Sequence, residues 1–241
     1  MVVQRSQSRF STNVAWLASR HCFSFGQHYD QTNTHFGLLM VSNDDIVAPG
    51  AGFDTHPHRD MEIVTWVLSG SLVHQDSQGN NGVIYPGLAQ RMSAGRGILH
   101  SEKNDSWRLT DTPAHCDPVH FIQMWVLPDT PGINPGYQQL DINDQLDSTG
   151  LAVVASGLAE HSHTTAIHIA QSRAGLLAGR LAPGERQGLP TAPRLHLFVA
   201  VGAVELESGE RLEAGDSARM SESGGIAVTA GSAGAEILVW Q

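Results

Sequence analysis

The hydrophobic positions of this chain fall in short runs that are separated by glycine, proline and other turn-forming residues. Examples are "EIVTWVLSG" at 62–70 and "LHLFVAVGAVEL" at 195–206, which are rich in branched and aromatic side chains. The chain contains 25 Gly and 11 Pro among 241 residues, which favours many short strands joined by tight turns over long helices. The pattern predicts an all-β protein, and a hydrophobic content of 41% is enough for a sizeable core.

This strand pattern occurs twice along the chain. The segment "APGAGFDTHPH" at 48–58 resembles "APGERQGLPTA" at 182–192, and "GILHSE" at 97–102 resembles "GIAVTA" at 225–230. Glycines recur in the same order in both copies, as Gly70 and Gly202, Gly79 and Gly209, and Gly87 and Gly215. Two similar β domains in tandem explain the repeat. The segment 128–150, rich in Pro, Gly, Asn and Asp, is expected to connect them over the surface with one short turn of helix, and we place the domains at 1–132 and 133–241.

The two copies differ at four positions that can bind a metal ion. The first copy has His56, His58, His100 and Glu102. At the matching positions the second copy has Pro190, Ala192, Val228 and Ala230. A common scaffold would keep its glycines and its apolar alternation in both copies, whereas a metal site loses its ligands together. The four residues of the first copy therefore behave as a unit.

Their spacing predicts a shared location. Side chains two residues apart on a strand point to the same face, so His56 and His58 share a face, as do His100 and Glu102. A bend near Gly95 would re-aim the second strand. Three imidazoles and one carboxylate suit a divalent Fe, Mn, Ni, Cu or Zn ion, and they leave two positions of an octahedral ion open. Open positions indicate catalysis rather than a structural metal.

The sequence segments around these residues resemble those of a known family. "GAGFDTHPHRDMEIVTWVLSG" resembles the first cupin motif and "RMSAGRGILHSEKN" the second. The fuller combination, in which "HCFSFGQHYD" precedes the motifs and "HFIQMWVLP" follows them, is similar to the pirin family from about residue 20 to residue 127. The resemblance implies a bicupin, which consists of two tandem jelly-roll-like β-barrels. It also implies one metal ion, usually Fe²⁺, in the N-terminal barrel, bound by the residues that match the family's ligands: His56, His58, His100 and Glu102.

The same resemblance implies two functions. Some bacterial members cleave flavonols such as quercetin with O2, so we expect a metal-dependent dioxygenase of the quercetin 2,3-dioxygenase type, with a small aromatic substrate. Because Glu102 would be a ligand with a spare oxygen, we expect it to accept the proton of the substrate hydroxyl as the catalytic base. Other members regulate protein partners, so the alternative is a regulator whose metal changes its binding surface with oxidation state. Storage or sugar-isomerase roles, which other cupins have, fit the surrounding residues less well.

Several further residues are open to interpretation. In cupins at large a ligating carboxylate corresponds to Glu62, which remains a candidate ligand or a partner of a ligand. His74 and Asp76 in "HQDSQGN" are expected to stabilise a hairpin or line the rim of the site. The other candidates are an apolar wall formed by Phe53, Met92 and Trp125, structural roles for His115 and His120, and exposed positions for His161 and His163.

Charge and cysteine content exclude some classes of function. The formal net charge is −10 and no cluster of Lys and Arg is visible, so we expect no direct binding to nucleic acid. The N-terminus lacks an apolar signal region and the longest apolar run is too short to span a bilayer, so we expect a cytoplasmic protein without a membrane segment. The only cysteines, Cys22 and Cys116, fit a reducing compartment and give no disulfide framework.

Overall fold

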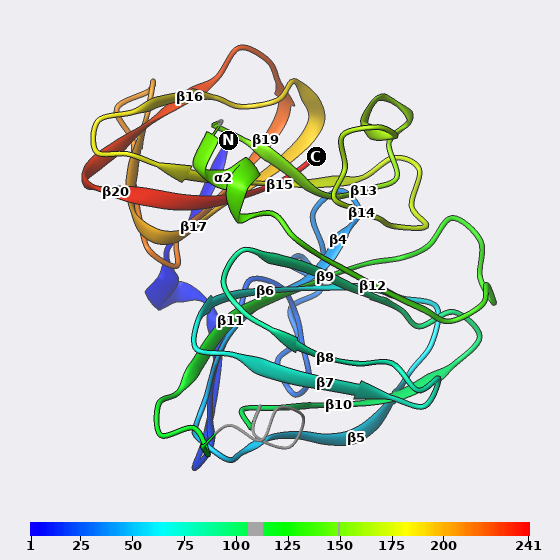
Figure 1. Cartoon of the computed structure of the whole chain (residues 1–241). Coiled ribbons are helices and arrows are strands. Elements are labelled where there is room, and N and C mark those ends of the chain that lie inside the picture. Colours follow the sequence, from blue (N-terminus) through cyan, green and yellow to red (C-terminus); the bar gives the residue numbers. More distant parts are fainter. Residues whose placement is uncertain (106–112, 149) are drawn as a thin grey trace.

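The computed structural model describes residues 1–105, 113–148 and 150–241, and it confirms the all-β prediction. The first barrel consists of two sheets that face each other (Figure 1). Its seven-stranded sheet has the order β12-β9-β6-β11-β4-β3-β2. The bounds of these strands are β2 (Phe10–Val14), β3 (Leu17–His21), β4 (Leu39–Val47), β6 (Glu62–Ser69), β9 (Leu88–Ser93), β11 (Val119–Val126) and β12 (Gly136–Asp141). Its four-stranded sheet has the order β5-β10-β7-β8, with β5 (Gly52–His58), β7 (Leu72–Asp76), β8 (Asn81–Ile84) and β10 (Ile98–Lys103).

The second barrel is built from one nine-stranded sheet in which two long strands bend and serve both walls. The main order is β1-β19-β17-β20-β15-β13-β14, while β16 pairs with β20 and β18 pairs with β17. The strands are β1 (Val2–Gln4), β13 (Ala152–Ser156), β14 (Ile167–His168), β15 (Gly175–Leu181), β16 (Arg186–Gly188), β17 (Ala192–Leu206), β18 (Arg211–Glu213), β19 (Ser217–Ser223) and β20 (Ala227–Trp240). The described helices are short: η1 (Ser6–Ser8), α2 (Asn143–Ser148) and η2 (Ala159–His161).

The internal repeat is visible in the backbone. The paired glycines have nearly equal positive φ angles: 75° and 73° at Gly70 and Gly202, 87° and 82° at Gly79 and Gly209, and 82° and 84° at Gly87 and Gly215. At Gly202 a side chain is also excluded by space, because a Cβ atom would lie 2.1 Å from the carbonyl oxygen of Gly234. The turns of both copies therefore require glycine for the same reason.

One part of the predicted alignment of the two copies is wrong by three residues. In the first barrel His100 pairs with His56, whereas in the second barrel Val228, which matches His100, pairs with Gln187. Strand pairing therefore matches His56 with Gln187, and not with Pro190, because Gln187 follows the turn glycine Gly184 by three residues whereas His56 follows Gly50 by six. The main inference is unaffected, because Gln187 supplies no imidazole and Val228 packs in an apolar interior.

Two strands cross the division that we predict at residue 133. β12 lies in the predicted surface connection but adds an edge to the first sheet by pairing with β9. β1, at the other end of the first domain, pairs with β19 of the second barrel. The helix expected in the connection is present as α2.

The outer face of the seven-stranded sheet is covered by the second barrel, as Figure 1 shows. Trp66 and Met124 from the first barrel pack in one cluster with Phe198, Leu238 and Trp240 from the second. Hydrogen bonds cross the same boundary, because the indole of Trp66 donates to Glu236 at 2.6 Å and that of Trp240 donates to the Met124 sulfur at 3.1 Å. The inner face of the seven-stranded sheet therefore lines the interior of the first barrel.

Candidate metal centre

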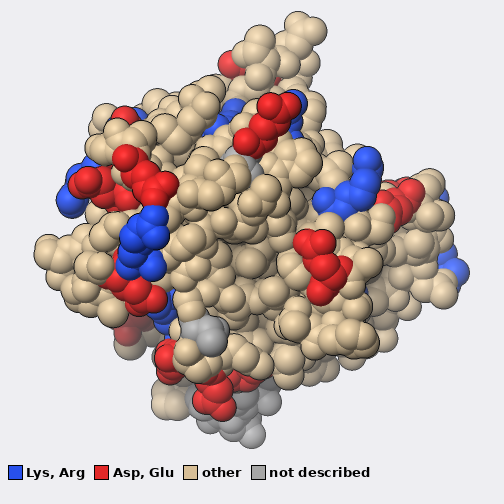
Figure 2. Space-filling model, turned by 90° about the horizontal axis from the view of Figure 1, so that it is seen from above, with Lys and Arg blue, Asp and Glu red and all other residues tan. Residues whose placement is uncertain are grey.

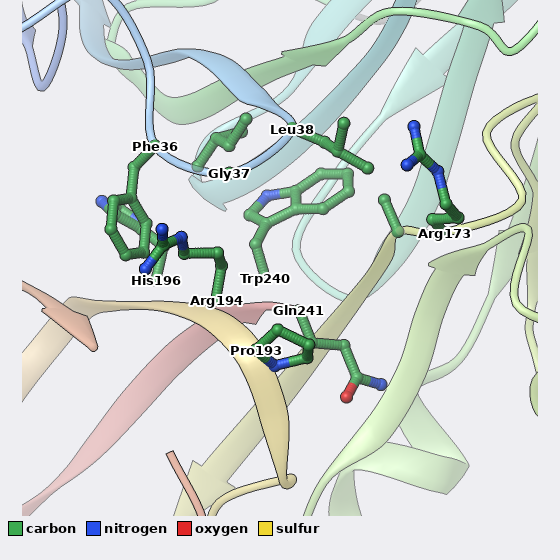
Figure 3. Close-up of a pocket in the computed structure, with 11 residues that line it drawn as sticks. Phe36, Gly37, Leu38, Arg173, Pro193, Arg194, His196, Trp240 and Gln241 are labelled. Atoms are coloured by element: carbon green, nitrogen blue, oxygen red, sulfur yellow. The ribbon is translucent and has the colours of Figure 1, made fainter. Parts of the chain in front are cut away.

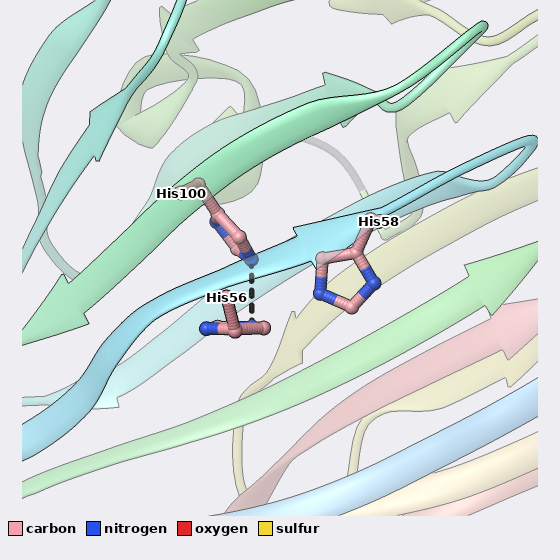
Figure 4. Close-up of side chains that lie close together, drawn as sticks. All are labelled: His56, His58 and His100. Atoms are coloured by element: carbon pink, nitrogen blue, oxygen red, sulfur yellow. Dashed lines mark hydrogen bonds between the residues drawn. The ribbon is translucent and has the colours of Figure 1, made fainter.

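Three of the four predicted ligands meet inside the first barrel. His56, His58 and His100 each place a ring nitrogen within 4.8 Å of the other two, and no other such group of His, Cys, Asp or Glu occurs in the part of the chain that the structure describes. Figure 4 shows the three rings converging from the neighbouring strands β5 and β10. The Nε2 atoms of His56 and His100 lie 3.1 Å apart, close to the separation of about 3 Å expected for adjacent ligands at about 2.1 Å from one ion.

Hydrogen bonds prepare His56 for metal binding. Its Nδ1 lies 2.7 Å from the carbonyl oxygen of Asp54, which can only accept a hydrogen bond. Nδ1 therefore carries the proton, and the lone pair of His56 is on Nε2, which faces His100. The Nε2 atom of His58 is buried and has no hydrogen-bond partner within the described chain. A buried ring nitrogen without a partner is costly, and a metal ion at the centre of the cluster would remove that cost.

The same crowding keeps two of the rings neutral. Burial, followed by the neighbouring histidines His100 and His56, lowers the pKa of His58 to about 4. Burial and the charges of His56 and His74 lower the pKa of His100 to about 3. Imidazole must be unprotonated to bind a metal ion, so neither ring has to lose a proton at neutral pH.

Glu102 lies beside the cluster and is held by its own partners. Its Oε2 is 4.0 Å from Nε2 of His100, and both of its oxygens accept from the Gln123 side-chain amide at 2.9 Å. The indole of Trp125 in turn donates to Oε1 of Gln123 at 3.0 Å, which fixes the orientation of that amide. The pairing of β10 with β5 shifts between His100 and Glu102, where the extra residue lies on β5 between Phe53 and His56 and not at the glycines before β10.

Glu62, the alternative carboxylate, does not face the histidines. It is fully buried on the opposite side of the seven-stranded sheet, where its Oε2 accepts from Ser93 at 2.9 Å and from the backbone of Ala170 in the second domain at 3.0 Å. The alternation expected from His58 onward fails because Asp60 has a φ of 48° and breaks the strand between β5 and β6. Glu62 therefore contacts neither the histidines nor Glu102, contrary to its candidate role as a ligand or a partner of a ligand, and its contacts are at the domain boundary.

His74 is buried behind His100 rather than exposed at a rim. Its Nδ1 lies 3.5 Å from Nδ1 of His100, and its Nε2 lies 3.2 Å from Oδ2 of Asp76. Burial would raise the pKa of Asp76, but hydrogen bonds from Asn80 and His74 lower it below the usual value, so Asp76 is an anionic acceptor. Nε2–H of His74 donates a hydrogen bond to Asp76. Nδ1 of His74 is then free to accept a hydrogen bond from Nδ1–H of His100. This arrangement leaves the lone pair of His100 on Nε2, toward the cluster. Asp76 also accepts from the backbone of Asn80, as expected for a hairpin residue.

The cluster opens into a pocket of about 600 Å³. His56, His58 and Glu102 lie on one wall, with Phe53 and Trp125 beside them, whereas the opposite wall comes from β2, β3, β4 and the segment 25–28. Two of the three residues proposed for an apolar wall, Phe53 and Trp125, are thus confirmed as lining, while Met92 packs in a core cluster instead. The volume lies within the range of about 300 to 1,000 Å³ that is typical of small-molecule sites.

The remaining candidates lie outside this pocket. Nδ1 of His115 is 2.6 Å from Oδ1 of Asn104, and Nε2 of His120 is 2.6 Å from Oδ1 of Asp44, so both histidines have structural partners. His163 is exposed as expected, whereas His161 is half-buried and hydrogen-bonded to Ser156. Both cysteines are free thiols, Cys22 buried and Cys116 exposed.

A smaller pocket of about 260 Å³ lies between the domains and contains none of the candidate ligands. In Figure 3, Phe36 and Leu38 approach it from one side, Pro193 and Arg194 from the other, and the ring of Trp240 lies between them.

The charge on the surface and the length of the helices bear on the predictions about nucleic acid and membranes. Lys and Arg are interspersed with Asp and Glu on the face that Figure 2 shows, and no extended basic patch is visible there. Among the described residues, the helices are all too short or too polar to cross a membrane.

Comparison with known proteins identifies the family. The family model described as Pirin matches residues 3–126, and that described as Quercetinase C-terminal cupin domain matches residues 153–240. A Mycobacterium tuberculosis protein named "Putative quercetin 2,3-dioxygenase" is 53% identical over 239 residues, which make up 99% of this chain and 93% of that protein. An Escherichia coli K12 protein named "Quercetin 2,3-dioxygenase" is 44% identical over 137 residues, 57% of this chain and 56% of that protein. The crystal structure of the Escherichia coli pirin YhhW in complex with nickel(II) has a TM-score of 0.85 and 32% identity, and the match covers 99% of this chain and 97% of that one. The chain therefore belongs to the pirin family.

Proposed function

We propose that this protein is a metal-dependent dioxygenase that cleaves a flavonol such as quercetin with O2. The observation that supports this most directly is the position of the histidine cluster, which borders a pocket large enough for a polyphenol. The names of the relatives from Mycobacterium tuberculosis and Escherichia coli agree with this activity.

The proposed ligands are His56, His58, His100 and Glu102, and the proposed metal is one Fe²⁺ per chain. Ni²⁺ is the alternative metal, because the YhhW structure contains nickel(II). A divalent transition metal supplies a Lewis acid that lowers the pKa of a hydroxyl group, together with the redox chemistry that O2 requires. The protein supplies ring nitrogens, a pocket with the apolar side chains of Phe53 and Trp125, and a carboxylate at its edge.

Glu102 has two proposed tasks, as a ligand and as the base that accepts the proton of the substrate hydroxyl. The amide of Gln123 contacts both of its oxygens and so keeps the carboxylate aimed into the pocket. Each oxygen has a further lone pair, so one can contact the metal while the other receives a proton.

The test is turnover by the metal-loaded protein. Metal-free protein would be loaded with Fe²⁺ or, in parallel, Ni²⁺, and the bound metal per chain would be measured before quercetin and O2 consumption and carbon monoxide release are followed. We expect one metal ion per chain and turnover that His56→Ala abolishes together with metal binding. Full metal loading without turnover of quercetin or other flavonols would overturn the proposal and favour a regulatory protein whose metal alters its binding to a partner.

A further inference from the structure

Asp45 is a second carboxylate in the same pocket, and the metal site does not account for it. Its side chain is only 3% exposed and lines the pocket from β4, in the seven-stranded sheet. His56, His58 and Glu102 lie across from it on the four-stranded sheet. The Oδ1 atom of Asp45 is buried and has no hydrogen-bond partner in the part of the chain that the structure describes.

The preceding residue, Asp44, is a carboxylate with a structural role, and it has two partners. Asp44 points to the other face of β4, where Arg9 lies 2.7 Å from its Oδ2 and His120 lies 2.6 Å from its Oδ1. Among the described residues, no Arg, Lys or His forms an ion pair with Asp45. An ionisable group that is buried without a partner costs stability, so a purely structural role does not explain why Asp45 is a carboxylate.

Polar neighbours surround Asp45 on β3 and β4, but none of them pairs with its Oδ1 in the described part of the chain. Ser19 lies directly opposite on β3, and its hydroxyl lowers the pKa of the Asp45 carboxyl. Ser19 is itself fixed by His21, whose Nδ1 is 3.4 Å from the hydroxyl and 2.9 Å from Oδ1 of Asn43. Burial raises the pKa of Asp45 to about 7, and the charges of Asp44 and Glu102 add to this effect while Ser19 and His120 oppose it. A hydrogen-bond donor from a ligand would favour the anionic form.

We propose that Asp45 is a substrate-binding residue whose free oxygen accepts a hydrogen bond from a hydroxyl group remote from the metal. This inference rests on the proposed function and narrows it, because it restricts good substrates to aromatic compounds with at least two hydroxyl groups. One hydroxyl would face the histidine wall, and a second would reach the Asp45 wall. A compound with only the first hydroxyl leaves Asp45 buried without a partner and is therefore rejected.

The test compares quercetin with 3-hydroxyflavone, which keeps the hydroxyl next to the carbonyl and lacks the others. Dissociation constants would be measured without O2, on protein with verified metal content, by the absorbance or fluorescence change of the flavonol. We expect the wild-type protein to prefer quercetin, and Asp45→Asn to reduce that preference by about 10- to 100-fold, because a neutral amide oxygen is a weaker hydrogen-bond acceptor than a carboxylate. The affinity for 3-hydroxyflavone should change little.

Controls separate the possible failures. Asp144→Asn removes an exposed carboxylate on α2 and should keep the wild-type preference. Circular dichroism and metal content show whether Asp45→Asn is folded and loaded. A preference for quercetin that survives in folded, loaded Asp45→Asn overturns the role of Asp45 while leaving the dioxygenase proposal intact. Absence of binding and turnover with either flavonol in the loaded wild-type protein overturns the proposed function, and the role of Asp45 with it.

Discussion

Replacing Asp45 with asparagine should stabilise the metal-free protein, and the gain should grow with pH. Burial raises the pKa of Asp45 to about 7, whereas a carboxyl group in the unfolded chain titrates near pH 4. Because the folded-state pKa is the higher one, the protonated carboxyl contributes stability that is complete below about pH 4 and is lost as the pH rises through about 7. Asparagine has no proton to lose, so Asp45→Asn escapes this loss.

The size of the effect follows from the shift. About three pH units at about 1.4 kcal/mol each give an upper limit of about 4 kcal/mol at alkaline pH, of which about 2 to 3 kcal/mol should develop between about pH 5 and pH 8. The charges of Asp44, Glu102 and His120, which also act on Asp45, are present in both proteins. Their own titrations therefore cancel to first order when the variant is compared with the wild type.

The assay is urea denaturation of both proteins in the presence of a chelator, since a bound metal ion would itself lower the pKa of Asp45. The midpoint and slope at each pH give the free energy of unfolding. A difference between the two proteins that stays constant from about pH 5 to pH 8 would refute the reasoning, because it would mean that the pKa of Asp45 is the same in the folded and unfolded states.

Three further predictions concern the metal centre. His56→Ala should lose metal binding while circular dichroism still shows the β-fold, because the second barrel forms without such ligands; collapse of the fold would indicate a structural metal. His74→Leu should weaken metal affinity by about 10- to 100-fold in a competition titration with a chromogenic chelator, because it removes the acceptor for the Nδ1 proton of His100. His163→Ala, at an exposed position, is the control. Equal metal affinities of His74→Leu and the wild-type protein would disprove the role of the His100–His74 hydrogen bond. Glu102→Gln should lower turnover by about 10²- to 10⁴-fold in protein that still contains metal, and near-normal turnover there would exclude Glu102 as the base.

The sequence could predict the parts of the site that depend on local geometry. Alternation along a strand is enough to place His56 beside His58, and the repeat identified the copy that contains the histidine cluster. The orientation of Glu62 could not be predicted in this way, because one residue with a positive φ, Asp60, resets the alternation. The contact of His74 with His100 depends on the pairing of β7 with β10, which is not local either.

Asp45 was missed although the sequence contains a signal for it. The strand "LMVSNDDIV" has four consecutive polar residues in the middle of an otherwise apolar run. One acidic residue of the pair must face inward if both neighbours in the chain lie on the strand. What the sequence could not supply is the partner of each carboxylate, since Arg9, His120 and Ser19 come from other strands or loops.

The apolar cluster shared by the two barrels has a consequence for how the chain folds and divides. Trp66 and Met124 pack in one buried cluster with Phe198 and Trp240 of the other barrel, so neither half retains its full core when the other is absent. The protein should therefore unfold in a single transition in which both barrels melt together. Two separately produced halves should be poorly soluble alone, yet should reassociate when mixed, with the tryptophan fluorescence of the intact chain restored. Such complementation would explain why a barrel without metal ligands is retained.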